Sequence, residues 1–152
     1  MLYAVIRLRS GIKASREVKD TLLFLNLKYI NNCVLLPKNP SIEGMLRKVK
    51  NYVSYGEINK ETLVLLLKKR LRKIGDKKVS EEDLKKYGIN SFEQLAEELL
   101  QQKRKLKDFP EFKKVFRLNS PRGGLKSKKL EYPKGDLGYV GEKINDLIKR
   151  ML

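Results

Sequence analysis

The strongest constraint on the fold of this chain lies in residues 31–49, where a short apolar run leads through a turn into a helical pattern. Residues 33–36 form a continuous apolar run that is typical of a buried strand. Pro37 and Pro40 bound the turn, and we expect Ser41 to be the N-cap of the helix that follows. A strand that leads directly into an amphipathic helix restricts the chain to folds that pack helices on a sheet.

The same pattern of elements extends over the first 60 residues. Residues 2–9 alternate with a period of two, which predicts a strand with one strongly apolar face. Ser15 is the expected N-cap of a helix with its own apolar stripe, and residues 55–58 predict a brief third strand. The order strand–helix–strand–helix–strand in so short a segment predicts a small α/β sandwich with both helices on one face of the sheet.

Gly44 lies inside the second predicted helix, where glycine costs about 1 kcal/mol relative to alanine. Close packing of the helix on the sheet would explain it. Close approach of a phosphate backbone would explain it equally well, and the sequence favours neither explanation.

The middle of the chain reads as a helical region. Asn59 is the expected N-cap of a leucine-rich helix that ends in a run of cations at 68–73, which we interpret as complementing the helix dipole. Ser80 and Ser91 resemble the first residues of capping boxes for two further helices. Residues 115–118 predict another strand.

Residues 119–138 form a polar segment rich in glycine, proline and lysine, and an apolar stripe at helical spacing then runs to the C-terminus. A loop of this length is uncommon in a compact domain and is usually functional or disordered. We therefore predict a core over residues 1–60 and a helical extension over 61–152. The extension contains the basic loop 119–138 and a C-terminal helix that packs back on the core.

The charge of the chain favours a polyanionic partner. Lys and Arg number 35 against 18 Asp and Glu, which gives a net charge of +17. Residues 1–60 carry 11 basic and 4 acidic side chains, residues 61–100 carry 9 and 8, and residues 101–152 carry 15 and 6. Nucleic acid is the commonest partner of such a protein, and an anionic membrane surface is the competing one.

Several classes of protein fit the sequence poorly. There is no tryptophan to anchor an amphipathic helix in a membrane, and no apolar run is long enough to span one. The absence of histidine excludes a Ser–His or Cys–His nucleophile, and one cysteine cannot build an ordinary zinc site. We predict a non-enzyme with no cofactor, metal or small-molecule substrate. The first residues lack the charge order of a secretory signal, so we expect the cytoplasm.

The binding signal is strongest near the C-terminal end. Arginine offers forked donors to phosphate oxygens, and glycine lets the backbone approach a phosphate closely. The basic residues, glycines and one amide side chain that carry this signal are Arg117, Asn119, Arg122, Gly123, Gly124, Lys126, Lys128, Lys129 and Lys134. A flexible, solvated loop is the alternative interpretation. Tyr139 fits two roles, a base-stacking ring or a hydrophobic staple at the start of the last helix.

Two pairs of motifs resemble one protein family. Residues 37–49 read PKNPSIEGMLRKV and residues 52–58 read YVSYGEI. Residues 117–124 read RLNSPRGG and residues 137–145 read LGYVGEKIN. Together they resemble the large-subunit ribosomal protein "L thirty" family in its longer archaeal and eukaryotic form, and the similarity covers nearly the whole chain.

The resemblance implies an α+β fold with a ferredoxin-like β-α-β-α-β core, in which a small antiparallel sheet carries helices on one face. It also implies a structural constituent of the large ribosomal subunit, bound to large-subunit ribosomal RNA and to neighbouring ribosomal proteins. A free-standing RNA chaperone or regulator on the same scaffold is the alternative. By this resemblance the second helix and residues 117–126 face RNA. The predicted RNA-binding residues outside that segment are Arg7, Arg9, Lys38, Arg47, Lys48, Lys50 and Tyr139.

Overall fold

The fold is built from a five-stranded sheet and six α-helices in a computed structural model that describes residues 2–127 and 129–152, so Lys128 lies outside the described residues. In chain order the elements are β1 (Leu2–Arg7), α1 (Arg16–Phe24), β2 (Asn32–Pro37), α2 (Pro40–Val49), β3 (Val53–Glu57), α3 (Lys60–Arg70), α4 (Glu81–Lys85), α5 (Phe92–Leu100), the 3₁₀ helix η1 (Leu106–Asp108), β4 (Val115–Arg117), β5 (Gly138–Tyr139) and α6 (Lys143–Met151).

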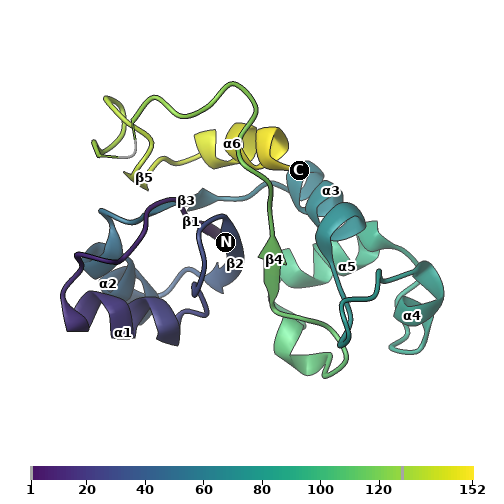
Figure 1. The fold of residues 1–152 in the computed structure, drawn as a ribbon. Coiled ribbons are helices and arrows are strands. Elements are labelled where there is room, and N and C mark those ends of the chain that lie inside the picture. The colour runs from purple at the N-terminus through teal and green to yellow at the C-terminus, as the bar shows by residue number, and fades with distance from the viewer. Residues whose placement is uncertain (1, 128) are drawn as a thin grey trace.

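The strand order in the sheet is β4-β2-β1-β3-β5. The central strand β1 runs antiparallel to β2 and β3, and β4 extends the sheet antiparallel beside β2. Helices α1 and α2 pack together on one face, below the sheet in Figure 1. The predicted α+β class and the ferredoxin-like core are thus confirmed.

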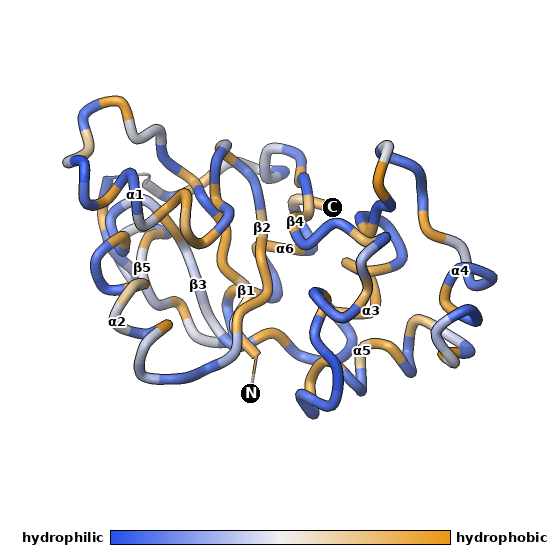
Figure 2. Tube along the Cα trace, turned by 90° about the horizontal axis from the view of Figure 1, so that it is seen from below, coloured by the Kyte–Doolittle hydropathy of each residue, from blue (hydrophilic) through white to orange (hydrophobic). Residues whose placement is uncertain are grey.

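The sheet is buried on both faces, which the alternation in residues 2–9 did not predict. Tyr3 and Val5 pack with α1 and α2 in one apolar cluster. Ala4 and Ile6 pack on the other face, in a larger cluster that includes residues of α3, α5 and α6. In Figure 2 the hydrophobic colour follows β1 and β2 for this reason.

The division of the chain into a core over residues 1–60 and a helical extension over residues 61–152 stays a prediction.

Side-chain caps start most of the helices, with one correction. Asn39, not Ser41, is the N-cap of α2, because the Asn39 side chain accepts a hydrogen bond of 2.8 Å from the backbone N–H of Ile42. Pro40 then occupies the first helical position, where its missing N–H costs nothing. Ser15, Asn59, Ser80 and Ser91 are the N-caps of α1, α3, α4 and α5 as expected. The predicted capping box forms at α4, but at α5 the Gln94 side chain accepts from the N–H of Asn90 instead of that of Ser91.

Helix α6 joins the C-terminal region to the sheet through Asn145. This buried side chain accepts a hydrogen bond of 2.9 Å from the N–H of Asn59 and donates one of 3.2 Å to the carbonyl of Glu57. It therefore fixes α6 against the junction between β3 and α3. No helix within residues 2–127 and 129–152 has the length and apolar character needed to cross a membrane.

The polar segment 119–138 folds back along α6, on the upper side of Figure 1. Its backbone N–H groups at Asn119 and Arg122 donate to the carbonyls of Met151 and Arg150, at 2.9 and 3.0 Å. The segment ends in β5, a two-residue strand that pairs in parallel with β3. The sequence did not predict β5, because two residues are too few to show a period.

Candidate nucleic-acid interface

The exposed end of α2 presents three of the predicted RNA-binding cations. Arg47 is exposed and has no ion-pair partner among the described residues. The Lys48 ammonium lies 3.0 Å from a carboxylate oxygen of Glu17, and the Lys50 ammonium lies 3.4 Å from one of Glu131. Both ion pairs are largely exposed, so each lysine retains its ability to exchange this partner for a phosphate.

Gly44 lies one turn before these cations and faces open space. A Cβ built on Gly44 meets no atom within 4 Å, apart from the helix's own backbone. Packing of α2 on the sheet therefore does not require glycine here. Gly44, Arg47 and Lys48 share one face of the helix, since residues three and four positions apart are neighbours on a helix surface.

Arg7 has a role inside the fold. Its guanidinium donates hydrogen bonds to the carbonyls of Arg9, Leu27 and Lys28, at 3.1, 2.8 and 2.7 Å. Partial burial lowers the pKa of Arg7. These contacts hold the chain that follows α1 against the end of β1. RNA binding by Arg7 stays a prediction.

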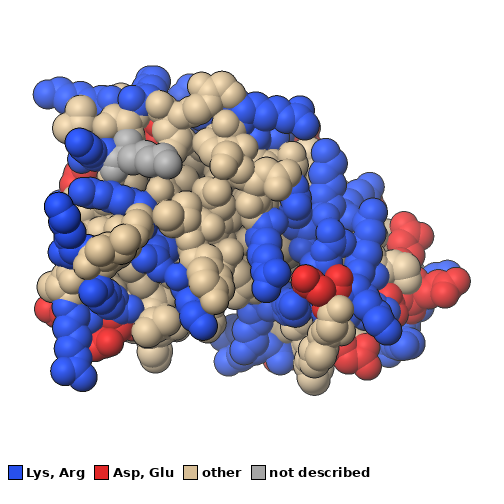
Figure 3. Space-filling model, in the orientation of Figure 1, with Lys and Arg blue, Asp and Glu red and all other residues tan. Residues whose placement is uncertain are grey.

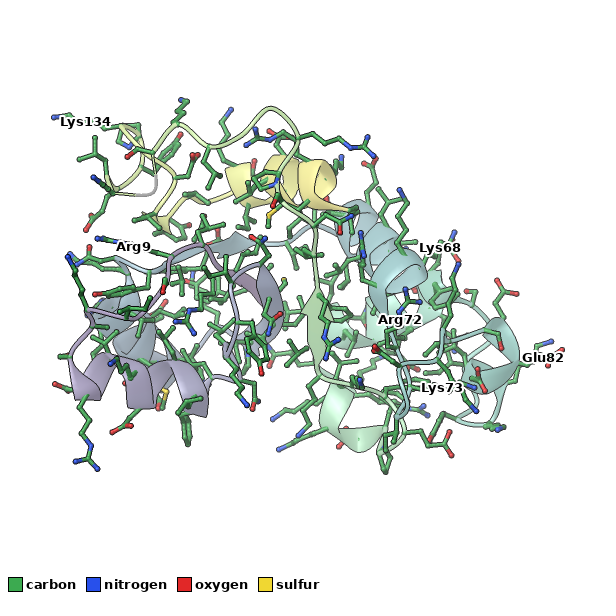
Figure 4. The ribbon with its side chains drawn as sticks, in the orientation of Figure 1. Arg9, Lys68, Arg72, Lys73, Glu82 and Lys134 are labelled. Carbon is green, nitrogen blue, oxygen red and sulfur yellow. The ribbon has the colours of Figure 1, made fainter. Side chains whose placement is uncertain are left out.

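Arg9, Lys38 and Tyr139 lie beside tyrosine rings. The Arg9 guanidinium lies 5.6 Å from the centre of the Tyr52 ring, and the Lys38 ammonium lies 5.7 Å from that of Tyr3. These distances suit cation–π attraction. The side chains of Arg9 and Lys134 both lie toward the left of Figure 4, on the side of α1 and α2.

Tyr139 lies in β5 and belongs to a cluster of three rings. Its centre is 5.6 Å from that of Tyr55 and 6.4 Å from that of Tyr3. Its hydroxyl donates to the Glu57 carboxylate at 2.7 Å, and this hydrogen bond together with burial raises the pKa of Tyr139 to about 12. The side chain remains 51 % exposed, which leaves ring surface open for a base.

The Gly-rich part of the loop is held by a residue that sequence reasoning missed. Arg150, in the last turn of α6, donates hydrogen bonds to the carbonyls of Arg122 and Gly124, at 3.2 and 2.8 Å. Gly123 and Gly124 have φ values of +78° and +72°, a backbone region that favours glycine. The exposed side chains of Arg122 and Lys126 thus project from a fixed backbone.

The predicted residues do not form one continuous patch. The ion pair between Lys50 and Glu131 brings the middle of the loop close to α2. Arg117 instead pairs with Asp76, at 3.5 Å, in the region that follows α3. In Figure 3 the basic surface accordingly divides into a left and a right area with uncharged surface between them.

Sequence reasoning also missed the cations that gather near Arg117. Arg70, Arg72 and Lys113 line a hollow with Arg117. The run of cations at 68–73 could have indicated this basic hollow. We interpreted the run as complementing the dipole of α3, and that interpretation required no further role for these cations. Lys113 lies forty positions after Lys73, the last residue of that run, so only the fold brings Lys113 near it.

The described residues offer no group of three or more His, Cys, Asp or Glu side chains that would hold a metal ion. Cys33 is fully buried in the sheet, and burial raises the pKa of its thiol to about 12. The thiol therefore stays protonated at neutral pH and is a poor nucleophile.

Comparison with known proteins identifies the family. Residues 3–53 match the family model described as ribosomal protein L30p/L7e. Proteins named large ribosomal subunit protein uL30 match almost end to end. Those of Archaeoglobus fulgidus and Thermofilum pendens are 46 % and 48 % identical, and each alignment covers 99 % of both chains. The Methanococcus vannielii protein is 46 % identical over 100 % of both chains. The relatives named above come from archaea, and all are structural proteins of the ribosome rather than enzymes. This chain is therefore a member of the ribosomal protein L30p/L7e family.

Proposed function

We propose that this protein is a structural constituent of the large ribosomal subunit in the cytoplasm, and that it binds large-subunit ribosomal RNA to support assembly and translation. The relatives are named as large-subunit proteins, and this chain aligns with them over nearly their whole length. The net charge of +17 suits a polyanionic partner. Neighbouring large-subunit proteins are further partners in this proposal.

The face of α2 that carries Gly44, Arg47 and Lys48 gives the proposal its strongest support. Glycine in a helix interior reduces stability, yet a Cβ at Gly44 would meet no atom of the described chain within 4 Å outside its own helix backbone. A partner that approaches the helix backbone explains why glycine is placed there. The two cations beside it make a phosphate backbone the fitting partner.

The loop supplies a second contact. Arg150 and the last carbonyls of α6 fix the backbone around Gly123 and Gly124, so Arg122 and Lys126 are presented without a large loss of backbone entropy on binding. Tyr139 adds an exposed ring to which a base can stack. The predicted division of the chain at residue 60 places these contacts in both parts.

Sedimentation of source-cell ribosomes tests the function. After a high-salt wash, the lysate is separated on a sucrose gradient and the protein is quantified by mass spectrometry. We expect one copy per large subunit. Recovery in the light fractions, with other ribosomal proteins retained in the large-subunit peak, would contradict the proposal and favour the free-standing RNA chaperone.

A further inference from the structure

A small hollow of about 190 Å³ lies between the end of α3, the turn that follows it and β4. It is lined by Arg70, Arg72, Asp76, Lys113, Val115 and Arg117. Four cations face one carboxylate, so the lining carries a net charge of +3. Basic side chains gather over this part of the molecule in Figure 3, and Arg72 lies there on the side of the helical region that faces β4 in Figure 4.

Two of these arginines lie outside the ion pairs that Asp76 forms. Arg70 and Arg72 are half-buried and form no ion pair with another described residue. The Arg70 Nε atom is inaccessible and has no hydrogen-bond partner in the described part of the chain. Because this Nε atom cannot be reached from the hollow, an oxygen-rich anion there would bind the other guanidinium nitrogens of the arginines that line it.

Asp76 is the one anion in the lining. Its carboxylate accepts a hydrogen bond of 3.1 Å from Lys113 and lies 3.5 Å from Arg117. The hydrogen bond to Lys113, followed by the charges of Lys113, Arg117 and Arg72, lowers the pKa of Asp76. The side chain is 54 % exposed, and exposed ion pairs of this kind are weak. A stronger anion can therefore replace it.

The backbone around the hollow is fixed before any ligand binds. The N–H of Ile74 donates to the carbonyl of Glu111 at 2.9 Å, and the N–H of Lys113 donates to the carbonyl of Arg72 at 2.8 Å. Strand β4 is held by its pairing with β2. The cations thus come from segments that are bonded to one another, which lowers the entropic cost of binding.

We propose that this hollow binds a phosphate group of the RNA backbone, and that Asp76 is an internal counter-ion which the phosphate displaces. The proposal rests on the proposed function and extends it to residues of α3 and the turn after it. Guanidinium groups bind phosphate oxygens through paired hydrogen bonds. Arg117 leads directly into the segment that contains Arg122, so one RNA strand can contact both places.

The test measures binding of the full chain to in vitro transcribed large-subunit rRNA over a series of KCl concentrations. We expect Arg72→Ala to weaken binding and to reduce the salt slope by about 0.7–0.9, the value of one lost phosphate contact. Lys85→Ala is the matched control, because it removes one exposed cation on α4 with no ion-pair partner in the described chain.

A second pair of variants tests displacement. Asp76→Asn removes the competing carboxylate, keeps the side-chain shape and tolerates the φ of +64° at this position. We expect it to raise rRNA affinity about two- to fivefold. Glu82→Gln makes the same charge change at the far right of Figure 4, on α4, and should raise affinity less.

The outcomes separate this proposal from the proposed function. If the unaltered protein binds rRNA while Arg72→Ala and Asp76→Asn behave like their controls, the hollow is not an RNA contact and the proposed function stands. If the unaltered protein does not bind rRNA, both are overturned. Sodium phosphate is then titrated against ¹⁵N-labelled protein. Shifts of the Arg70 and Arg72 Nε–H signals without rRNA binding would assign the hollow to free phosphate instead.

Discussion

Replacing Gly44 with alanine should separate folding from RNA binding. Gly44 lies within α2 and has no left-handed backbone that would exclude alanine. A Cβ there meets no atom within 4 Å outside the helix backbone, so no clash offsets the gain in helix propensity. That gain is about 1 kcal/mol. For a chain of 152 residues it corresponds to a rise in Tm of about 2–4 °C.

The same methyl group should weaken binding to rRNA. It projects beside Arg47 and Lys48, where it would hold a phosphate backbone away from the helix. Loss of one such contact, at about 1.4 kcal/mol, lowers the affinity about tenfold. Thermal unfolding followed by circular dichroism measures the first effect, and filter binding with large-subunit rRNA measures the second.

Ser41→Ala on the same helix is the control, because Asn39 and not Ser41 caps α2. It should change neither quantity appreciably, whereas Asn39→Ala should cost about 1 kcal/mol of stability. A higher Tm for Gly44→Ala with unchanged rRNA affinity would refute the role assigned to this face of α2. A lower Tm would refute the open surroundings of Gly44.

Two further predictions concern stability. Gly56→Ala places a Cβ against the carbonyl oxygen of Gly141, so we expect a loss of about 3 kcal/mol or more in urea unfolding, and a near-neutral result would contradict the approach of these two backbones. The hydrogen bonds from Lys73 and then from the Ser80 N–H lower the pKa of Asp83 from 3.8 to about 2. Stability from this group is present above pH 3.8 and is lost as the pH falls through about 2. Asp83→Asn should therefore flatten the stability profile between pH 4 and pH 2, and an unchanged slope would argue against it.

The core of the fold could be predicted because each local pattern agrees with the final structure. The strand–helix–strand–helix–strand order, the caps at Ser15 and Asn59 and the leucine stripe of α3 are local features, and each is confirmed. The choice of Ser41 over Asn39 was wrong because both residue types cap helices well. Which of them serves depends on where Pro40 falls in the first turn.

The arrangement of the basic residues could not be predicted in the same way. Whether an arginine faces a partner or the chain's own carbonyls depends on contacts between distant segments. Arg7 reaches carbonyls twenty positions away, and Arg150 reaches back to Gly124. The run of cations at 68–73 can be interpreted as part of a binding site only when Lys113 is folded beside it. Such pairings leave no periodic trace in the sequence.

The pairing of β5 with β3 has a consequence for the order in which the chain folds during synthesis. The edge of β3 remains unpaired, and the apolar cluster on the Ala4 and Ile6 face of β1 remains incomplete, until β5 and α6 have left the ribosome that makes them. Loop closure over so many residues is slow compared with local helix formation. Before this step, the nascent protein exposes an unpaired strand edge and apolar surface, which is the condition that recruits chaperones. We therefore expect the sheet to be completed and the basic loop to form together, late in synthesis.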